Sequence, residues 1–209
     1  MIEFIDNLLQ LLVTLICWCI SGVFYYHSRK QAYFLLTSFF GCFTFAGLYW
    51  TLYFLLFHET PQVFYVSEIG WISGCIFLYL LQYTISDEKE RDFKSHAVWI
   101  SVIIGIPLYV FYSFDGDILF NAITNLMMIL ISWWSIRGVL YMRYQQKRDQ
   151  NCYYFHILAL CFVFLEYCLW IAGVFWTGDA LSNPYFVIDF LLTIWRIFLL
   201  IVVRKAVEQ

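Results

Sequence analysis

Three charged residues inside apolar stretches are the clearest candidates for chemistry in this sequence. Glu166 lies within residues 152–176, and Asp189 and Arg196 lie within residues 184–204. An ionisable side chain at bilayer depth costs at least about 2.5–3.5 kcal/mol, so it faces protein, water or a ligand rather than lipid. We therefore expect these three residues to form a polar core inside a membrane protein.

The depth of these charges follows from the helix rise of about 1.5 Å per residue. If the two spans meet the outer surface near Trp176 and Pro184, Glu166 lies roughly 15 Å and Arg196 roughly 18 Å below it. We predict that Glu166 and Arg196 form a buried pair, with Asp189 about two turns above Arg196 on one helix face. The pair has two interpretations: it holds two helices together, or it serves a ligand, an ion or a switch.

Carboxylates and tryptophans around this core suggest what it could bind. Together, Glu68, Glu166 and Asp189 would give an outward-facing cavity an acidic lining, suited to a cationic or hydrogen-bond-donating ligand. A protonated, neutral carboxylic acid is an equally physical state there. Trp50 and Trp170 could line the pocket or cap a cation, although core packing is the simpler interpretation.

Signatures of catalysis are missing from the sequence. It has no P-loop, no nucleophile elbow, no dinucleotide-binding glycine pattern and no H-E-x-x-H motif. Its seven cysteines form no C-x-x-C pair and lie in or beside apolar spans, where buried thiols are the simplest interpretation. We expect no enzymatic activity, no cofactor, no metal site and no nucleic-acid partner.

Composition identifies the class of protein that must position these residues. Of the 209 residues, 63% are hydrophobic, 22% aromatic and 13% charged. Soluble domains contain about 45–50% apolar and about 25% charged residues, so this composition indicates an integral membrane protein. The lipid bilayer is its expected environment.

Apolar windows of about 17–25 residues predict an all-α, seven-helix membrane bundle in a single domain covering residues 1–209. The predicted helices cover residues 8–27, 31–57, 66–86, 97–113, 118–143, 152–176 and 184–204. The mixed-charge loop at residues 86–94 is most simply a solvated connector, and His156 is best explained by packing near the membrane surface.

The basic residues between these spans predict the orientation. They fall in alternate connections and after the last span: Arg29, Lys30, Lys89, Arg91, Lys94, Arg143, Lys147, Arg148, Arg204 and Lys205. The opposite loops carry acidic residues instead: Glu59, Asp115, Asp117 and Asp179. Since cytoplasmic loops are enriched in Lys and Arg, the positive-inside rule places the N-terminus outside and the C-terminus in the cytoplasm.

An internal repeat is visible when the first and fifth predicted helices are compared. Residues 18–25 and 134–141 share Trp, Ile, Gly, Val and Tyr at matching positions. Later residues align in the same way: Tyr33 with Tyr153, Trp50 with Trp170, and Glu68 with Asp189. This pattern predicts a parallel three-plus-one-plus-three arrangement, a design that transporters use and that seven-helix receptors also permit.

Several short features carry a resemblance to a known family. They are Ile69-Gly70, the segment from Leu80 to Thr84, the charged loop, Ile106-Pro107, and Asp189 followed by Trp195-Arg196. In these features the chain resembles the seven-helix N-terminal sensor region of some bacterial histidine kinases and diguanylate cyclases. The resemblance implies an outward-facing sensor of a ligand or of the membrane state. Those proteins continue into an output domain, whereas no kinase histidine box or ATP-binding region occurs before Gln209, so we expect a separate cytoplasmic partner.

These observations favour a receptor-like, sensory membrane protein that takes part in signal transduction in a bacterial inner membrane. A ligand in the polar core would bias helix packing and change what the cytoplasmic side presents. One alternative is a small-solute transporter that uses the same core, and another is an accessory subunit of a membrane complex. Both the sensor and the transporter would bind a small molecule.

Overall fold

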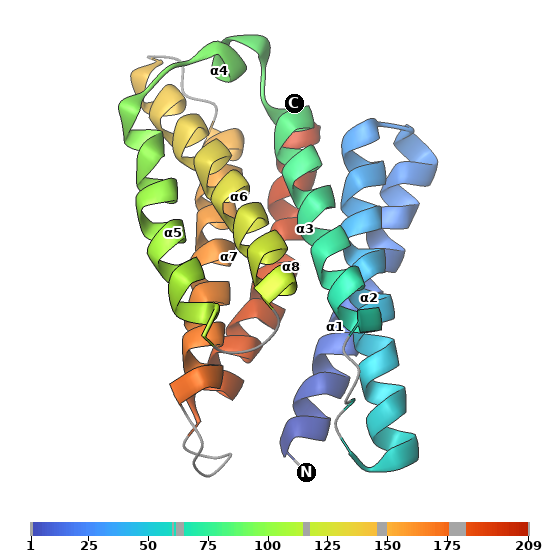
Figure 1. The fold of residues 1–209 in the computed structure, drawn as a ribbon. Coiled ribbons are helices and arrows are strands. Elements are labelled where there is room, and N and C mark those ends of the chain that lie inside the picture. Colours follow the sequence, from blue (N-terminus) through green and yellow to red (C-terminus); the bar gives the residue numbers. More distant parts are fainter. Residues whose placement is uncertain are drawn as a thin grey trace.

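The computed structural model describes residues 2–59, 61, 65–114, 118–145, 150–175 and 183–208. In these residues the regular structure is helical throughout (Figure 1). The elements are α1 (Ile2–Ser28), α2 (Gln31–Phe57), α3 (Tyr65–Ile85), α4 (Glu88–Asp92), the 3-10 helix η1 (His96–Trp99), α5 (Ile100–Tyr112), α6 (Ile118–Tyr144), α7 (Gln150–Phe175) and α8 (Pro184–Val207).

Six of these helices are apolar and at least 20 residues long, namely α1, α2, α3, α6, α7 and α8. A helix of about 20 residues spans the hydrocarbon core of a bilayer. The seventh apolar rod, His96–Tyr112, combines η1 and α5 and is shorter. The chain is therefore a multi-pass integral membrane protein.

The observed helix bounds differ most from the expected ones at the two ends of the chain, and α8 ends at Val207 rather than at residue 204. Helix α1 begins at Ile2 rather than at residue 8. The fourth apolar segment opens with η1, where the Ser95 hydroxyl accepts a hydrogen bond from the amide of Ala97. Within the charged loop, the Asp87 carboxylate caps the short helix α4 by accepting from the amide of Glu90.

Helix α1 has one exposed apolar face and one buried, more polar face. Its exposed apolar residues recur every three or four positions: Ile5, Leu9, Leu12, Ile16, Ile20 and Val23. The opposite face carries Thr14, Cys17 and Ser21, which are buried. Since the apolar face points outward and the more polar face inward, the helix suits a bilayer around a partly polar interior.

The long helices pack as a closed ring. Each helix contacts the next in the order α1, α2, α3, α6, α7, α8, and α8 contacts α1 in turn (Figure 1). Helix α5 packs outside this ring, against α6. Inside the ring, large buried side chains fill the core, among them Phe39, Phe40, Leu78, Phe155, Phe162 and Leu199.

Two glycines let α2 and α3 approach closely. A Cβ atom at Gly74 would lie 2.4 Å from Cε2 of Phe43, and one at Gly70 would lie 2.9 Å from Cβ of Ala46. Real Cβ atoms do not approach this closely, so these positions require glycine. The close approach restricts the ring of Phe43, which packs against the guanidinium of Arg196.

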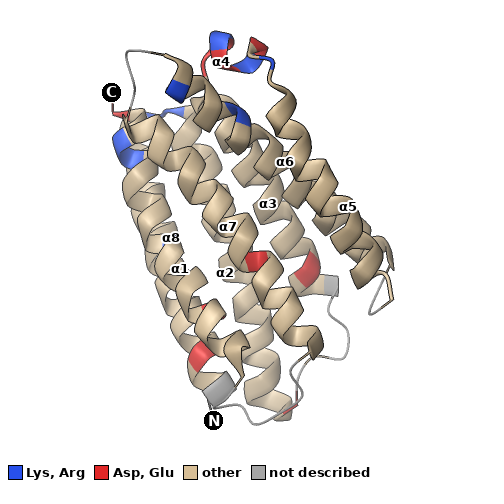
Figure 2. Ribbon diagram, turned by 90° about the vertical axis from the view of Figure 1, so that its left-hand side faces the viewer, with Lys and Arg blue, Asp and Glu red and all other residues tan. Residues whose placement is uncertain are grey.

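Charged residues divide the bundle into two ends (Figure 2). We call "basic end" the end that carries the α1–α2 turn, α4 and the last turn of α8, and "N-terminal end" the opposite one. Lys and Arg gather at the basic end, and the two chain termini lie at opposite ends (Figures 1 and 2). Five loop residues of the charge pattern lie outside the described residues: Asp115, Asp117, Lys147, Arg148 and Asp179.

Candidate ligand cavity

A cavity of about 390 Å³ lies inside the ring, in the half nearer the N-terminal end. All six ring helices contribute to its lining. Its polar lining includes Asp6, Asn7, Gln10, Thr124, Glu166, Asp189 and Arg196. Its aromatic lining includes Phe43, Trp50, Trp71, Phe120, Trp170, Tyr185 and Phe186. The lining is therefore both polar and aromatic.

Five of the six residues singled out from the sequence line this cavity: Trp50, Glu166, Trp170, Asp189 and Arg196. Glu68 is not part of the described lining. It lies in the first turn of α3 and is half-exposed, one turn before Trp71, which does line the cavity. The helices thus converge on the polar core, while Glu68 stays near the start of α3.

The expected ion pair between Glu166 and Arg196 is not formed. Among the described residues, ion pairs join only His156 to Glu90 and Arg204 to Glu208. Asp189 and Arg196 are nevertheless almost completely buried, at 6% and 5% exposure. A buried guanidinium without a carboxylate contact needs other polar partners.

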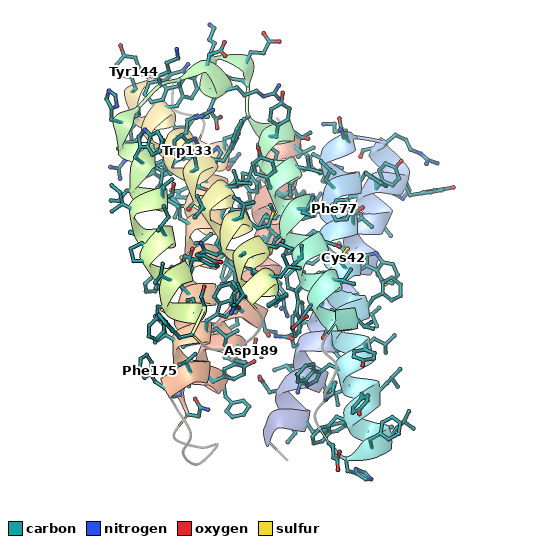
Figure 3. The ribbon with its side chains drawn as sticks, in the orientation of Figure 1. Cys42, Phe77, Trp133, Tyr144, Phe175 and Asp189 are labelled. Atoms are coloured by element: carbon teal, nitrogen blue, oxygen red, sulfur yellow. The ribbon has the colours of Figure 1, made fainter. Side chains whose placement is uncertain are left out.

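Helix α1 supplies those partners. Gln10 Nε2 donates to Asp189 Oδ1 at 2.6 Å, and Thr14 Oγ1 donates to the Gln10 carbonyl at 2.6 Å. Arg196 Nη1 donates to Thr14 Oγ1 at 3.3 Å, and its guanidinium carbon lies 5.1 Å from the ring centre of Phe43. A chain of hydrogen bonds through α1 therefore connects the two buried charges of α8, Asp189 and Arg196. Figure 3 shows Asp189 in the half of the bundle toward the N-terminal end.

Sequence reasoning missed this contribution of α1. The signal was present as a row of polar residues at helical spacing, Asp6 or Asn7, Gln10 and Thr14, in a segment that is otherwise apolar. Residues three and four apart share one helix face, so this row predicts a polar stripe. A charged group on another helix is its natural partner.

Glu166 differs from the other two charged residues. It lines the cavity from α7, but within the described part of the chain it accepts no hydrogen bond and forms no ion pair. Its carboxylate is therefore available to a group inside the cavity. Arg196 likewise keeps guanidinium donors beyond its single bond to Thr14.

Aromatic side chains hold the cavity walls in place. The rings of Trp50 and Trp71 lie 6.0 Å apart, and Trp170 meets Tyr112 of α5 edge to face at 5.2 Å. Tyr112 also donates from its hydroxyl to the carbonyl of Tyr167 at 3.2 Å. Helix α5 lies outside the ring, yet it positions a cavity wall through these contacts.

The chemistry of the lining favours positive or hydrogen-bond-donating ligands. Three acidic residues, Asp6, Glu166 and Asp189, share the cavity with one basic residue, Arg196. Indole faces attract cations through their quadrupole. Across the part of the chain that is described, no group of three or more His, Cys, Asp or Glu could hold a metal ion.

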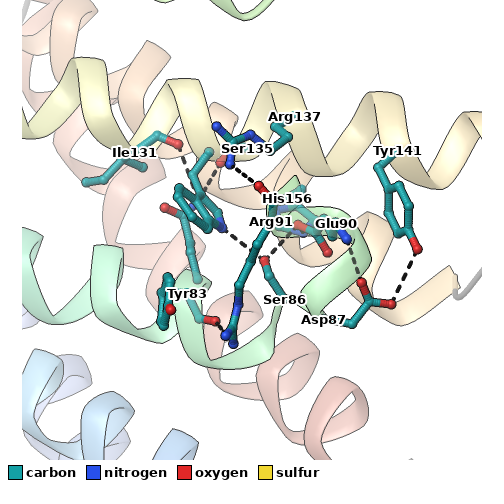
Figure 4. A network of polar contacts seen from close by, with 12 residues as sticks. Tyr83, Ser86, Asp87, Glu90, Arg91, Ile131, Ser135, Arg137, Tyr141 and His156 are labelled. Atoms are coloured by element: carbon teal, nitrogen blue, oxygen red, sulfur yellow. Dashed lines mark hydrogen bonds and ion pairs between the residues drawn. The ribbon is translucent and has the colours of Figure 1, made fainter. Parts of the chain in front are cut away.

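A second polar cluster lies at the basic end, and we call it the clamp: Ser86, Glu90, Trp134 and His156 (Figure 4). Nε2 of His156 lies 3.0 Å from Oε1 of Glu90, and these residues are 0% and 1% exposed. Ser86 Oγ donates to Glu90 Oε1 at 2.7 Å and accepts from Trp134 Nε1 at 3.0 Å. Neither ring nitrogen of His156 has a hydrogen-bond partner among the described residues.

The clamp corrects one expectation. The loop at residues 86–94 is not simply a solvated connector, because Glu90 points inward and joins α4 to α7. His156 is fully buried inside the bundle, against Gly138 of α6. A Cβ atom at Gly138 would lie 2.4 Å from both Cδ2 and Nε2 of the imidazole, so only glycine leaves room for this ring.

Comparisons of the chain with models of protein families, with curated proteins and with solved structures find no match. The functional argument therefore depends on the geometry of the molecule. That geometry establishes an integral membrane protein whose ring of helices encloses a polar, aromatic-walled cavity.

Proposed function

We propose that this protein is a receptor-like, sensory membrane protein that binds a small cationic or hydrogen-bond-donating solute in the cavity. The observation that carries the proposal is the Glu166 carboxylate, which lines the cavity and makes no hydrogen bond or ion pair with a described residue. An unpaired carboxylate near the centre of a membrane bundle is costly, and a ligand donor would remove that cost.

The proposed orientation makes the cavity outward-facing. Lys and Arg gather at the basic end, and the positive-inside rule assigns that end to the cytoplasm. The termini lie at opposite ends of the bundle, which requires an odd number of membrane crossings. Six long helices with the rod His96–Tyr112 as the fourth crossing give seven. Solute would then enter from the outside, near the start of α1.

A solute in the cavity would touch helices that also reach the cytoplasmic side. Glu166 belongs to α7, Asp189 and Arg196 belong to α8, and Gln10 belongs to α1. At the basic end, Lys30 Nζ donates to the carbonyl of Val207 at 2.6 Å and ties the end of α8 to the α1–α2 turn. A shift of α8 on binding would alter this surface, which a separate cytoplasmic partner would read.

A transporter is the second candidate, and the order of contacts in the ring favours it. The contacts of α1 with α2 and of α2 with α3 recur as those of α6 with α7 and of α7 with α8. The two groups of three meet twice, at α3–α6 and at α8–α1. This order fits a parallel repeat with α5 as the connector, and transporters place their sites between such repeats.

Ligand binding can be tested by thermal unfolding of the purified protein in detergent. The probes are tetramethylammonium, guanidinium, small diamines and neutral polyols of similar size. We expect at least one cation or multiple hydrogen-bond donor to raise Tm in wild type and not in Glu166→Gln or Asp189→Asn. Glu68→Gln is the matched control and should retain the shift. Equal loss in all three variants would contradict the cavity assignment.

Uptake into liposomes separates the two candidates. The solute that raises Tm is offered outside vesicles that contain wild type or Asp189→Asn. Binding without flux supports the receptor. Flux that depends on Asp189 supports the transporter and rejects the receptor.

A further inference from the structure

A second hollow, of about 680 Å³, lies at the basic end, where the segment after α4 and η1 meet α6. Its lining includes Asp92, Lys94, His96, Trp99, Trp133 and Arg137. None of these residues lines the cavity near the N-terminal end. The hollow is therefore a separate site.

Arg137 provides a fixed positive charge in this hollow. Its Nη1 donates to the carbonyl of Arg91 at 2.8 Å, and its guanidinium carbon lies 4.7 Å from the ring centre of Trp134. Its Nε is buried without a hydrogen-bond partner, and no described carboxylate forms an ion pair with it. The guanidinium is thus held in position while its charge is left uncompensated.

Lys94 adds positive charge at the rim of the hollow. Lys94 and His96 are exposed, and Asp92 is the one acidic residue among the lining residues described. The guanidinium of Arg91 is already engaged: it donates to the Tyr83 carbonyl at 2.8 Å and lies 4.0 Å from the ring centre of Tyr83. An anion is therefore the ligand that this rim attracts.

One side of the hollow is apolar and continues onto α5. Trp99 and Trp133 meet edge to face at 5.1 Å, and Trp99 is 54% exposed. The residues that follow Trp99 on α5 include Ile100, Ile103 and Ile104, all exposed. Tryptophan at the level of lipid head groups and isoleucine at the level of the chains form a surface for an amphiphile.

We propose that this hollow binds the phosphate group of an anionic membrane phospholipid, with an acyl chain along the exposed face of α5. Arginine and lysine donors match phosphate oxygens, and basic pockets between membrane helices bind anionic head groups. A soluble phosphate compound shares this head-group chemistry, but it would make no use of the isoleucine face.

The test is lipid binding by the full chain in detergent, measured by native mass spectrometry. Phosphatidylglycerol is compared with zwitterionic phosphatidylcholine, and glycerol 3-phosphate serves as the chain-free competitor. The variants are Arg137→Gln and Lys94→Gln. Their matched controls are Arg143→Gln on the same helix and Lys89→Gln on α4, since neither residue lines the hollow.

We expect one phosphatidylglycerol to bind in preference to phosphatidylcholine. Each of the two variants should weaken this binding about fivefold, as expected for one basic residue beside an anionic lipid, and the controls should not. Lys94 is exposed and makes no hydrogen bond or ion pair with described residues, so its variant tests the site even if Arg137→Gln unfolds.

Equal binding of both lipids, or equal loss in variants and controls, overturns the proposal. Displacement by glycerol 3-phosphate at concentrations equal to the lipid assigns the hollow to a soluble phosphate and overturns the lipid assignment.

Discussion

The cavity and the clamp use buried polar groups in opposite ways. In the clamp, Glu90 contacts both His156 and Ser86, and Ser86 also accepts from Trp134. In the cavity, Glu166 has no described partner, and Arg196 makes one hydrogen bond, to Thr14. The clamp thus brings a buried carboxylate into contact with two other side chains, whereas the cavity contains a carboxylate that makes no hydrogen bond or ion pair with a described residue.

This difference separates a structural role from a functional one. Buried polar groups that satisfy one another fix the packing of helices, whereas unsatisfied groups around a cavity cost stability unless something binds there. We therefore expect the clamp residues to affect stability, and the cavity residues to affect the proposed binding. Substitutions in the two halves should affect different measurements.

The largest loss of stability is expected for Glu90→Ala, which leaves His156 buried without its carboxylate. Removing this carboxylate takes a contact from both Ser86 and His156, and each buried polar group left without its partner costs about 1–3 kcal/mol in free energy of unfolding. Denaturant unfolding in detergent measures this loss. The control is Glu88→Ala, an exposed position on the same short helix, which should change little. Similar losses in both variants would mean that the clamp does not exist as described.

The next largest effect is expected for Gly138→Ala, because the new methyl group would overlap the imidazole of His156. Overpacking of this kind costs about 1–3 kcal/mol. Gly22→Ala is the matched control, since its nearest neighbour, Cγ2 of Thr37, would be 3.9 Å from the new Cβ. The comparison fails if the two variants unfold at the same temperature.

A smaller effect is expected for Trp134→Phe, which removes the donor to Ser86 and keeps an aromatic ring. The loss of one hydrogen bond costs about 1 kcal/mol. Trp133→Phe is the control, since Trp133 meets Trp99 through its ring and its indole nitrogen makes no described hydrogen bond. Thermal unfolding of both variants against wild type gives the difference. A larger loss for Trp133→Phe would contradict the network.

The smallest change in stability is expected for Glu166→Gln, because no described partner is lost. Without added solute, its free energy of unfolding should stay within about 0.5 kcal/mol of wild type, as at positions without specific contacts. The same variant should lose the solute-dependent rise in Tm. A large loss of stability without solute would place Glu166 with the structural residues and remove the contrast between the halves.

The sequence was sufficient to predict the all-helical membrane class and most of the residues that line the cavity. It was not sufficient to predict which side chains these residues contact. Apolar length and the cost of buried charge were sufficient to bring Glu166, Asp189 and Arg196 together. They could not predict that Arg196 bonds to Thr14, because helix order in the ring depends on packing between distant segments. The inward turn of Glu90 was missed for a similar reason: a loop of mixed charge gives no sign that one carboxylate finds a histidine 66 positions later, at His156.

The contact between α1 and α8 has a consequence for biogenesis. Gln10 and Thr14 leave the ribosome long before Asp189 and Arg196, so α1 enters the membrane with its polar stripe still lacking those partners. Insertion of α8 closes the ring and completes the hydrogen-bond chain. The cavity thus becomes complete only at the last step of assembly. A chain that fails to seat α8 leaves the polar stripe of α1 exposed, a feature that membrane quality control can recognise.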